Sequence, residues 1–90
     1  MIHRTSASFW ERYDRLPTAL QKIADAKFLL LKSNPGHPSL QFKLVGKHWS
    51  ARVSQGYRVL AMQVEDGYLW FWIGNHDDYE KIIASARKWR

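Results

Sequence analysis

The sequence contains no cysteine, which excludes disulfide bonds and thiolate metal sites. It also contains no long hydrophobic run. Its longest apolar stretches, residues 28–31 and 69–73, are far shorter than the roughly 20 residues of a transmembrane helix. Residues 1–8 have no apolar core of the kind that marks a signal peptide. From these absences we expect a cytoplasmic protein without a membrane anchor.

Acidic residues are also few, since eight Asp and Glu stand against fourteen Lys and Arg, for a net charge of +6 with neutral histidines. Ninety residues predict one domain over residues 1–90. Such an excess of positive charge favours a polyanionic partner, either nucleic acid or an acidic protein. Five Trp and four Tyr accompany the charge, and unstacked bases stack on such rings. The alternative is a basic protein with no anionic partner, whose aromatic residues fill the core.

The first third of the chain predicts two helices. Ser6 and Ser8 are favourable N-cap residues. The apolar residues that follow recur with helical spacing: Phe9, Tyr13 and Leu16. A second helical period covers residues 17–32 and begins at Pro17, which suits a first helical turn. It ends in residues 33–39, which contain two prolines and a glycine. Together the two segments predict a helical hairpin.

The period changes to two at Leu40 and stays so to residue 73. Turn residues interrupt it at Gly46-Lys47, Gln55-Gly56 and Asp66-Gly67, and the last pair is typical of a type I′ hairpin. Residues 57–65 are apolar on both faces, which indicates a central strand. We expect a three-stranded antiparallel meander over residues 40–73, with the helical hairpin on one face.

The two ends of the chain complete the α+β pattern. Residues 1–5 are either an edge strand or a frayed end. Asn75 or Asp77 caps a last helix over residues 78–89, whose basic end suits the helix dipole.

Two arginines are the candidate phosphate ligands. Arg52 and Arg58 lie on either side of a short turn, and Arg52 points away from the face of Trp49. If Arg58 shares that side, two guanidinium groups converge there, with Lys43 on the preceding strand beside them. The alternative is that both arginines pair with Asp or Glu at the surface. An otherwise apolar strand around Arg58 favours a functional reason for the cation.

A polar cluster follows the apolar strand WFWI directly. It places His76 and Tyr79 three residues apart, within reach of one another if that turn is helical. Histidine titrates near neutral pH and can give or take a proton, so His76 is a candidate catalytic residue. A lone histidine is more often structural or merely exposed. His48, at a turn near the same sheet, is the second candidate.

Metal and cofactor sites find no support in the sequence. The acidic residues beside His76 are successive, so they do not face one way, and no HExxH spacing occurs. A glycine-rich phosphate loop and a GxSxG nucleophile elbow are also absent. We expect neither a metal nor a cofactor.

The order of these motifs resembles the RelE/ParE superfamily of bacterial type II toxins. The residues that carry the resemblance are NPGHPSL at 34–40, WSARV at 49–53, GYRVL at 56–60 and WFWIGNHDDYE at 70–80. The resemblance covers residues 9–83 and is closest to the RelE/HigB/YafQ-like branch. It implies a single RelE-like domain, in which an N-terminal helical hairpin packs on a curved antiparallel β-sheet and a short C-terminal helix follows.

The resemblance also implies an activity. Members of the RelE branch are ribosome-dependent mRNA endonucleases that inhibit translation without a metal. In their reaction the 2′-OH of the mRNA attacks the adjacent phosphate, which gives a cyclic phosphate and a free 5′-OH. By position Arg58 corresponds to the arginine that stabilises the transition state, His76 to a general acid or base, and Tyr79 to a C-terminal tyrosine. Lys43, His48 and Arg52 are the expected RNA-binding residues.

Three functions stay open at this point. The first is an mRNA endonuclease that contacts mRNA and rRNA on the ribosome. The second is a ParE-like toxin that binds DNA gyrase without cleaving RNA, and the third is an inactive member that only binds its antitoxin. Each implies a cognate antitoxin protein as partner. The strand of Ser50 is a departure, because the RelE branch carries more lysine there.

Overall fold

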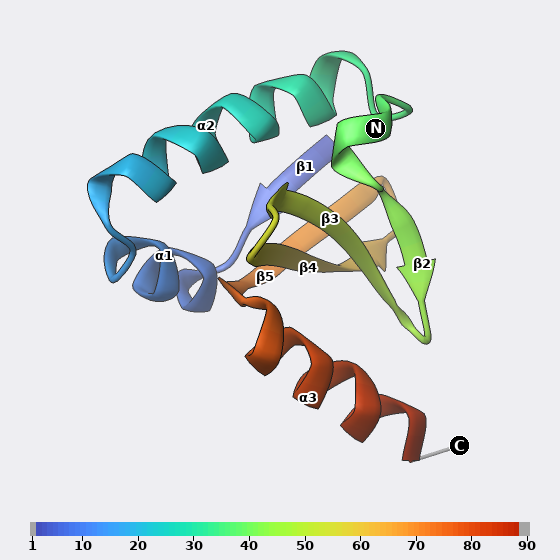
Figure 1. The fold of residues 1–90 in the computed structure, drawn as a ribbon. Coiled ribbons are helices and arrows are strands. Elements are labelled where there is room, and N and C mark those ends of the chain that lie inside the picture. The colour runs from blue at the N-terminus through green and yellow to red at the C-terminus, as the bar shows by residue number, and fades with distance from the viewer. Residues whose placement is uncertain (1, 89–90) are drawn as a thin grey trace.

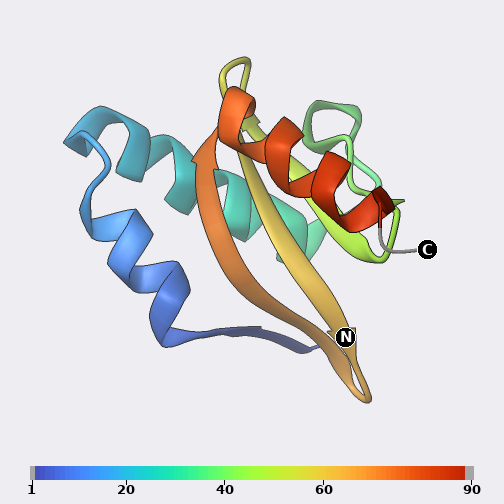
Figure 2. The same cartoon turned by 90° about the horizontal axis from the view of Figure 1, so that it is seen from below.

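A five-stranded sheet carries the helical hairpin α1–α2 on one face and a third helix, α3, on the other (Figure 1, Figure 2). The computed structural model describes residues 2–88. Its elements are β1 (Ile2–Thr5), α1 (Ala7–Asp14), α2 (Thr18–Ser33), the 3₁₀ helix η1 (Pro38–Leu40), β2 (Lys43–Val45), β3 (His48–Ser54), β4 (Tyr57–Val64), β5 (Gly67–Asn75) and α3 (His76–Lys88). The predicted α+β class, with its N-terminal hairpin and C-terminal helix, is confirmed.

The sheet has the strand order β1-β5-β4-β3-β2. Strands β2 to β5 form an antiparallel meander, and β1 lies parallel to β5, with Ile2 opposite Gly67 and Thr5 opposite Trp70. The expectation of three strands over residues 40–73 is wrong, because the three turns in this segment separate four strands. Of the two alternatives for residues 1–5, the structure has the edge strand.

The first strand of the meander is shorter than its alternation predicts. Leu40 is buried in η1 rather than in a strand, and Gln41 has a φ of 46° and a ψ of 42°, in the left-handed region. This conformation ends the alternation, and β2 begins only at Lys43. From Lys43 the chain runs antiparallel to β3 (Figure 1).

The face under the hairpin holds the larger core. Ala51, Val53 and Trp70 are buried there together with Phe9 of α1 and Leu31 of α2. The predicted shared face of Trp49, Ala51 and Val53 therefore packs under the helices, as expected from strand alternation. Ser6 is the N-cap of α1, with its hydroxyl accepting from the Phe9 N–H at 3.3 Å.

The opposite face holds a smaller core under α3, formed by Leu60, Trp72, Tyr79 and Ile83. The helix begins at His76, two residues before the expected start, and the expected last residue, Trp89, lies outside the described residues. Asn75 is the cap, since its side-chain oxygen accepts from the Asp78 N–H at 2.8 Å. The β5 strand therefore passes directly into α3, which fixes where the polar cluster lies.

The turn between β4 and β5 differs from the predicted type I′ hairpin. Its residues are Glu65 and Asp66, and neither has a positive φ. Gly67 is already part of β5, where a Cβ atom would lie 1.8 Å from the Ile2 carbonyl oxygen. The glycine therefore permits the close approach of β1 and is not needed for the turn.

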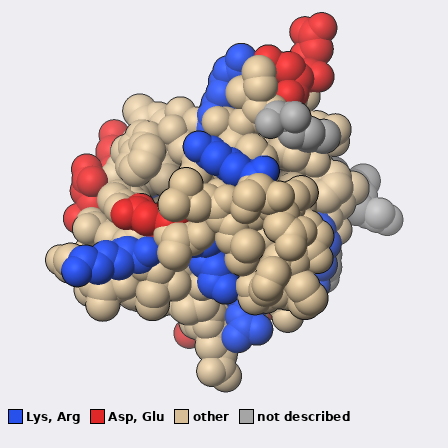
Figure 3. Space-filling model, turned by 90° about the horizontal axis from the view of Figure 1, so that it is seen from above, with Lys and Arg blue, Asp and Glu red and all other residues tan. Residues whose placement is uncertain are grey.

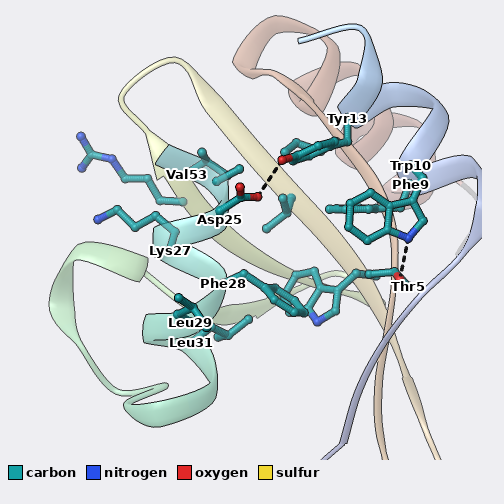
Figure 4. A pocket seen from close by; sticks show the side chains of 15 residues that line it. Thr5, Phe9, Trp10, Tyr13, Asp25, Lys27, Phe28, Leu29, Leu31 and Val53 are labelled. Carbon is teal, nitrogen blue, oxygen red and sulfur yellow. Dashed lines mark hydrogen bonds between the residues drawn. The ribbon is translucent and has the colours of Figure 1, made fainter. Parts of the chain in front are cut away.

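A cavity of about 270 Å³ separates the hairpin from the sheet. Its lining is mostly aromatic and aliphatic, and Figure 4 shows Phe9, Phe28 and Leu31 around it. The Tyr13 hydroxyl donates to Asp25 Oδ1 at 2.7 Å along its wall.

Figure 3 views the molecule from the α2 side, where Lys and Arg are interspersed with uncharged surface. Among the described helices, none is long and apolar enough to cross a membrane.

Candidate active site

A polar pocket of about 120 Å³ lies where α3 meets the sheet. Its walls come from four parts of the chain: the segment that enters β2, the middle of β3, the start of β4 and the first turn of α3. The lining residues are Gln41, Lys43, Ser50, Arg52, Arg58, His76, Tyr79 and Glu80. The pocket therefore brings together five of the six side chains predicted as functional, although their roles stay predictions.

Arg52 and Arg58 face each other directly across the β3–β4 pair. Directly opposite residues of an antiparallel pair point to the same side of the sheet, so the condition for two converging guanidinium groups is met. Burial lowers the pKa of Arg58, Arg52 lowers it further, and Tyr79 and Glu80 oppose this effect. Within residues 2–88, neither arginine has a carboxylate within 4.0 Å, so the alternative of surface ion pairs is not seen there.

The Arg58 guanidinium is fixed by the turn that precedes β4. Its Nη1 donates to the carbonyl oxygens of Ser54 at 2.8 Å, Tyr57 at 3.0 Å and Gln55 at 3.3 Å. In the described part of the chain Nε and Nη2 make no hydrogen bond. Since a guanidinium has five N–H donors, the group is anchored on one side and keeps donors for a ligand.

His76 is the first residue of α3. Its backbone N–H donates to the Gly56 carbonyl oxygen at 2.8 Å, which ties the helix start to the β3–β4 turn. Its Nε2 lies 3.4 Å from Glu80 Oε1, and its side chain is 40% exposed. The imidazole is thus held on one side by a carboxylate and reaches solvent on the other.

Tyr79 lies one helical turn after His76, with ring centroids 5.5 Å apart. The Tyr79 ring is buried against Leu60 and Trp72, and Tyr79 also lines the pocket. Packing under α3 therefore fixes the position of the phenol. The arrangement places two groups capable of proton transfer beside a fixed guanidinium.

Three lining residues were not predicted as functional. Glu80 had a signal in the sequence, because a residue four positions after His76 lies on the same face of a helix. Ser50 also had one, since it alternates with Arg52 on one strand and therefore shares its face. Gln41 had none, because its place depends on the left-handed conformation after η1.

His48 lies outside the pocket, unlike the other predicted RNA-binding residues. It is at the far end of β3 and packs on Phe71, with ring centroids 5.2 Å apart. Its Nδ1 is buried without a hydrogen-bond partner, and burial, followed by the charge of Lys47, lowers the pKa of the ring. His48 therefore lies on the predicted face of β3 but at the end of the strand that is away from the pocket.

Residues 2–88 contain no group of three His, Asp or Glu side chains placed to hold one metal ion. The side chains that line the pocket are three cations, an imidazole, a phenol, a carboxylate and two neutral hydrogen-bonding groups. Such a set can bind a phosphate, transfer protons and stabilise negative charge.

No protein-family model matches this chain, and no curated protein does. Solved structures do match. A chain of the RelB–RelE antitoxin–toxin complex from Methanococcus jannaschii superposes with a TM-score of 0.67 at 12% identity, and the match covers 88% of this chain and 96% of that chain. The isolated E. coli RelE toxin superposes with a TM-score of 0.59 at 10% identity, and the match covers 93% of this chain and 96% of that chain. The YoeB/ParE toxin from Agrobacterium tumefaciens superposes with a TM-score of 0.50 at 17% identity, and the match covers 78% of this chain and 90% of that chain.

These matches extend over most of each chain at low sequence identity, so what is shared is the fold. The chain has a RelE/ParE-like toxin fold. The resemblance that the motifs indicated is thereby confirmed at the level of the fold, and the activity is a separate question.

Proposed function

We propose that this chain is the toxin of a type II toxin–antitoxin pair and that it cleaves mRNA on the ribosome. The observation that carries the proposal is the meeting of Arg58, His76 and Tyr79 with Lys43 and Arg52 in one polar pocket. These residues come from three strands and a helix, and a merely solvated surface gives no reason for them to converge. Their convergence on a RelE/ParE-like fold supports an endonuclease over a purely binding protein.

The pocket suits the scissile phosphate. Lys43 and Arg52 supply two cations at the surface, and Arg58 presents its unbonded donors from an anchored position. As the 2′-oxygen bonds to phosphorus, negative charge grows on the non-bridging oxygens, and a preorganised guanidinium stabilises it. Because the turn carbonyls already hold Arg58, little reorganisation is needed during the reaction.

Two proton transfers balance the reaction. His76 takes the proton from the 2′-OH as the new O–P bond forms, and Glu80, 3.4 Å away, stabilises the resulting imidazolium. Tyr79 gives its proton to the 5′-oxygen as the P–O5′ bond breaks. The products are a 2′,3′-cyclic phosphate and a 5′-OH, so no water or metal enters the step.

A cognate antitoxin is the proposed protein partner. The chain has a net charge of +6, which favours an acidic segment. The hairpin adds exposed apolar side chains at Trp10, Ile23 and Leu29, and the cavity beneath it is lined mostly by apolar groups. An antitoxin segment with acidic and apolar residues would match both features.

The test is induced expression in a bacterial host with primer extension on an abundant mRNA. Wild-type protein is expected to arrest growth and to give cleavages at defined codon positions. His76→Ala is expected to reduce cleavage by about 100-fold or more, as for loss of a general base. Arg58→Lys, which keeps the charge but loses the planar fork, is expected to lose about 100-fold.

Matched controls lie next to the pocket and away from it. Asp77→Ala removes an exposed charge from the same helical turn as His76, and Arg15→Ala removes an exposed arginine outside the pocket. Both should cleave like wild type, and thermal unfolding should show all four variants folded. Growth arrest with intact mRNA would contradict the proposal and support a toxin that acts on DNA gyrase instead. No arrest would leave an antitoxin-binding protein.

A further inference from the structure

The cavity between the hairpin and the sheet has no part in the proposed mechanism. Its volume is about 270 Å³, and most of the side chains that line it are aromatic or aliphatic. An engineered apolar cavity of about 150 Å³ stays dry and binds benzene. The cavity under the hairpin is therefore large enough for a molecule of one or two rings, and it offers water few hydrogen-bond partners.

Aromatic rings form much of the wall of this cavity. Phe9, Trp10 and Tyr13 line it from α1, Phe28 lines it from α2 and Trp70 lines it from β5 (Figure 4). Phe9 and Trp10 meet edge to face, with ring centroids 5.1 Å apart. A further ring can pack against such a wall through the same edge-to-face or offset contacts. The lining thus favours an aromatic ligand over an aliphatic one.

Polar groups of the wall are bonded to one another. Trp10 Nε1 donates to Thr5 Oγ1 at 2.9 Å, and the Tyr13 hydroxyl donates to Asp25 Oδ1 at 2.7 Å (Figure 4). These hydrogen bonds join α1 to β1 and to α2, so the rings are held in place without a ligand. A carboxylate has about four acceptor sites, so Asp25 can also accept a hydrogen bond from a donor inside the cavity.

A small residue leaves the cavity open on the side of α2. Ala24 is 8% exposed and lines the cavity. An internal cavity lowers stability in proportion to its volume, and a larger aliphatic side chain at this position would fill part of the space. Preformed apolar cavities with a few well-placed polar groups are typical sites for small molecules.

We propose that this cavity binds a small aromatic molecule of one or two rings that carries a hydrogen-bond donor for Asp25. The occupant is a free molecule rather than a side chain of another protein, because the hydrogen bonds of Trp10 and Tyr13 close the wall. A tethered ring needs a permanent opening, whereas a free molecule needs only a transient one. The inference goes beyond the proposed function and does not depend on it. Arg52 lines both this cavity and the polar pocket, so the occupant would lie beside a residue of the candidate active site.

The test titrates indole and benzofuran into the full chain and follows NMR chemical shifts. The two probes have the same shape, but only indole has an N–H donor. Indole is expected to bind with a Kd of about 1 mM or lower and to shift the signals of Phe28, Leu31 and Val53. Benzofuran should bind about fivefold more weakly, as for the loss of one net hydrogen bond. Asp25→Asn, which keeps an acceptor for Tyr13 but loses the charge, should reduce this preference.

Filling the cavity should abolish the site. Ala24→Leu is expected to raise the unfolding temperature and to weaken indole binding by about tenfold or more. Ala26→Leu, on the exposed side of the same helix, is the matched control and should bind indole like wild type. Val59→Ile adds one methylene group to another lining residue and should give a smaller loss in the same direction. This variant keeps the test available if Ala24→Leu does not fold.

The inference is overturned if indole does not bind at millimolar concentration, or if the filling variants bind it like wild type. It is also overturned if N-acetyl-tryptophanamide binds more tightly than indole, which would assign the cavity to a side chain of a partner protein. Shifts of the same signals when the protein alone is concentrated would assign it to a second copy of the chain and overturn it too. None of these outcomes depends on mRNA cleavage, so the proposed function stands or falls separately.

Discussion

Gly74 lies directly opposite Arg58 across the β4–β5 pair, and a Cβ atom placed there would lie 2.5 Å from the Trp72 ring. The strand that ends in the polar cluster is therefore tightly packed at its last residues. Trp72 in turn contributes to the core that holds Tyr79. The position of the pocket thus depends on a glycine that does not line it.

Gly74→Ala is expected to lower the free energy of unfolding by about 1–3 kcal/mol, because the indole of Trp72 must move out of its packed position. Gly56→Ala is the matched control, since a Cβ there meets nothing within 4 Å and the change should stay within about 0.5 kcal/mol. Urea unfolding followed by tryptophan fluorescence measures both. Equal stabilities for the two variants would contradict the packing argument.

The Asn75 cap is expected to support both stability and activity. Asn75→Ala removes the 2.8 Å hydrogen bond to the Asp78 N–H and should cost about 1 kcal/mol. Because His76 follows the cap directly, mRNA cleavage should fall as well, whereas Asn75→Asp should preserve both properties. Thermal unfolding and primer extension on the same three proteins give the comparison. Loss of stability with full cleavage would show that the cap does not position His76.

Glu80 is expected to have a modest effect on cleavage. Exposed ion pairs contribute about 0.2–1 kcal/mol, so Glu80→Gln should slow cleavage roughly two- to fivefold. The measurement is the initial cleavage rate on purified ribosomes at low and high salt, with Lys81→Gln, in the next helical position, as control. The difference between wild type and Glu80→Gln should shrink at high salt, where the pair is screened. A loss as large as that of His76→Ala would mean that Glu80 itself transfers a proton.

Stability is expected to fall as the pH drops below neutrality. Burial, followed by the charge of Lys32, lowers the pKa of His3 from its ordinary 6.5, and its Nδ1 accepts a hydrogen bond from the Trp70 indole at 3.0 Å. Between the lowered folded pKa and 6.5 the unfolded chain binds more protons, so the free energy of unfolding decreases as pH falls through this range. Burial lowers the pKa of His48 also, which adds to the same trend.

The His3 contribution can be separated by substitution. His3→Asn keeps an acceptor for the indole but does not titrate, so its urea midpoint between pH 7.5 and 5.5 should change less than that of wild type. His3→Asn with His48→Asn should change least. An identical pH dependence in wild type and His3→Asn would show that the His3–Trp70 bond has no part in it.

The local pattern of the sequence predicted much of the site. Alternation assigned Trp49 and Arg52 to opposite faces of β3, and the short turn placed Arg58 beside Arg52, because these relations span only a few residues. The parallel pairing of β1 with β5 could not be predicted this way, since it joins residues 65 positions apart, as in Ile2 with Gly67. Gln41 was missed because a left-handed residue interrupts the alternation that was used to place β2.

The placement of His48 shows the limit of face assignment. Alternation puts His48 on the same side as Ser50 and Arg52, which is correct, but it does not say which stretch of that side α3 covers. The covering depends on the angle at which α3 leaves β5, and that angle is fixed by contacts between Tyr79, Ile83 and the sheet. Those contacts are long-range and leave no periodic signal.

The order of the strands has a consequence for self-association. The most apolar strand, β5, is paired with β4 on one side and with β1 on the other. Past the end of β1, the Ser8 hydroxyl donates a hydrogen bond to the Phe71 carbonyl oxygen at 2.9 Å. The outer strands are short, four residues in β1 and three in β2, and β1 carries His3 and Arg4. A strand whose hydrogen-bonding groups are covered cannot template amyloid-like stacking. The small N-terminal strand thus covers β5 from Gly67 to Trp70, and this half of the strand has no free edge to pair with another copy of the chain.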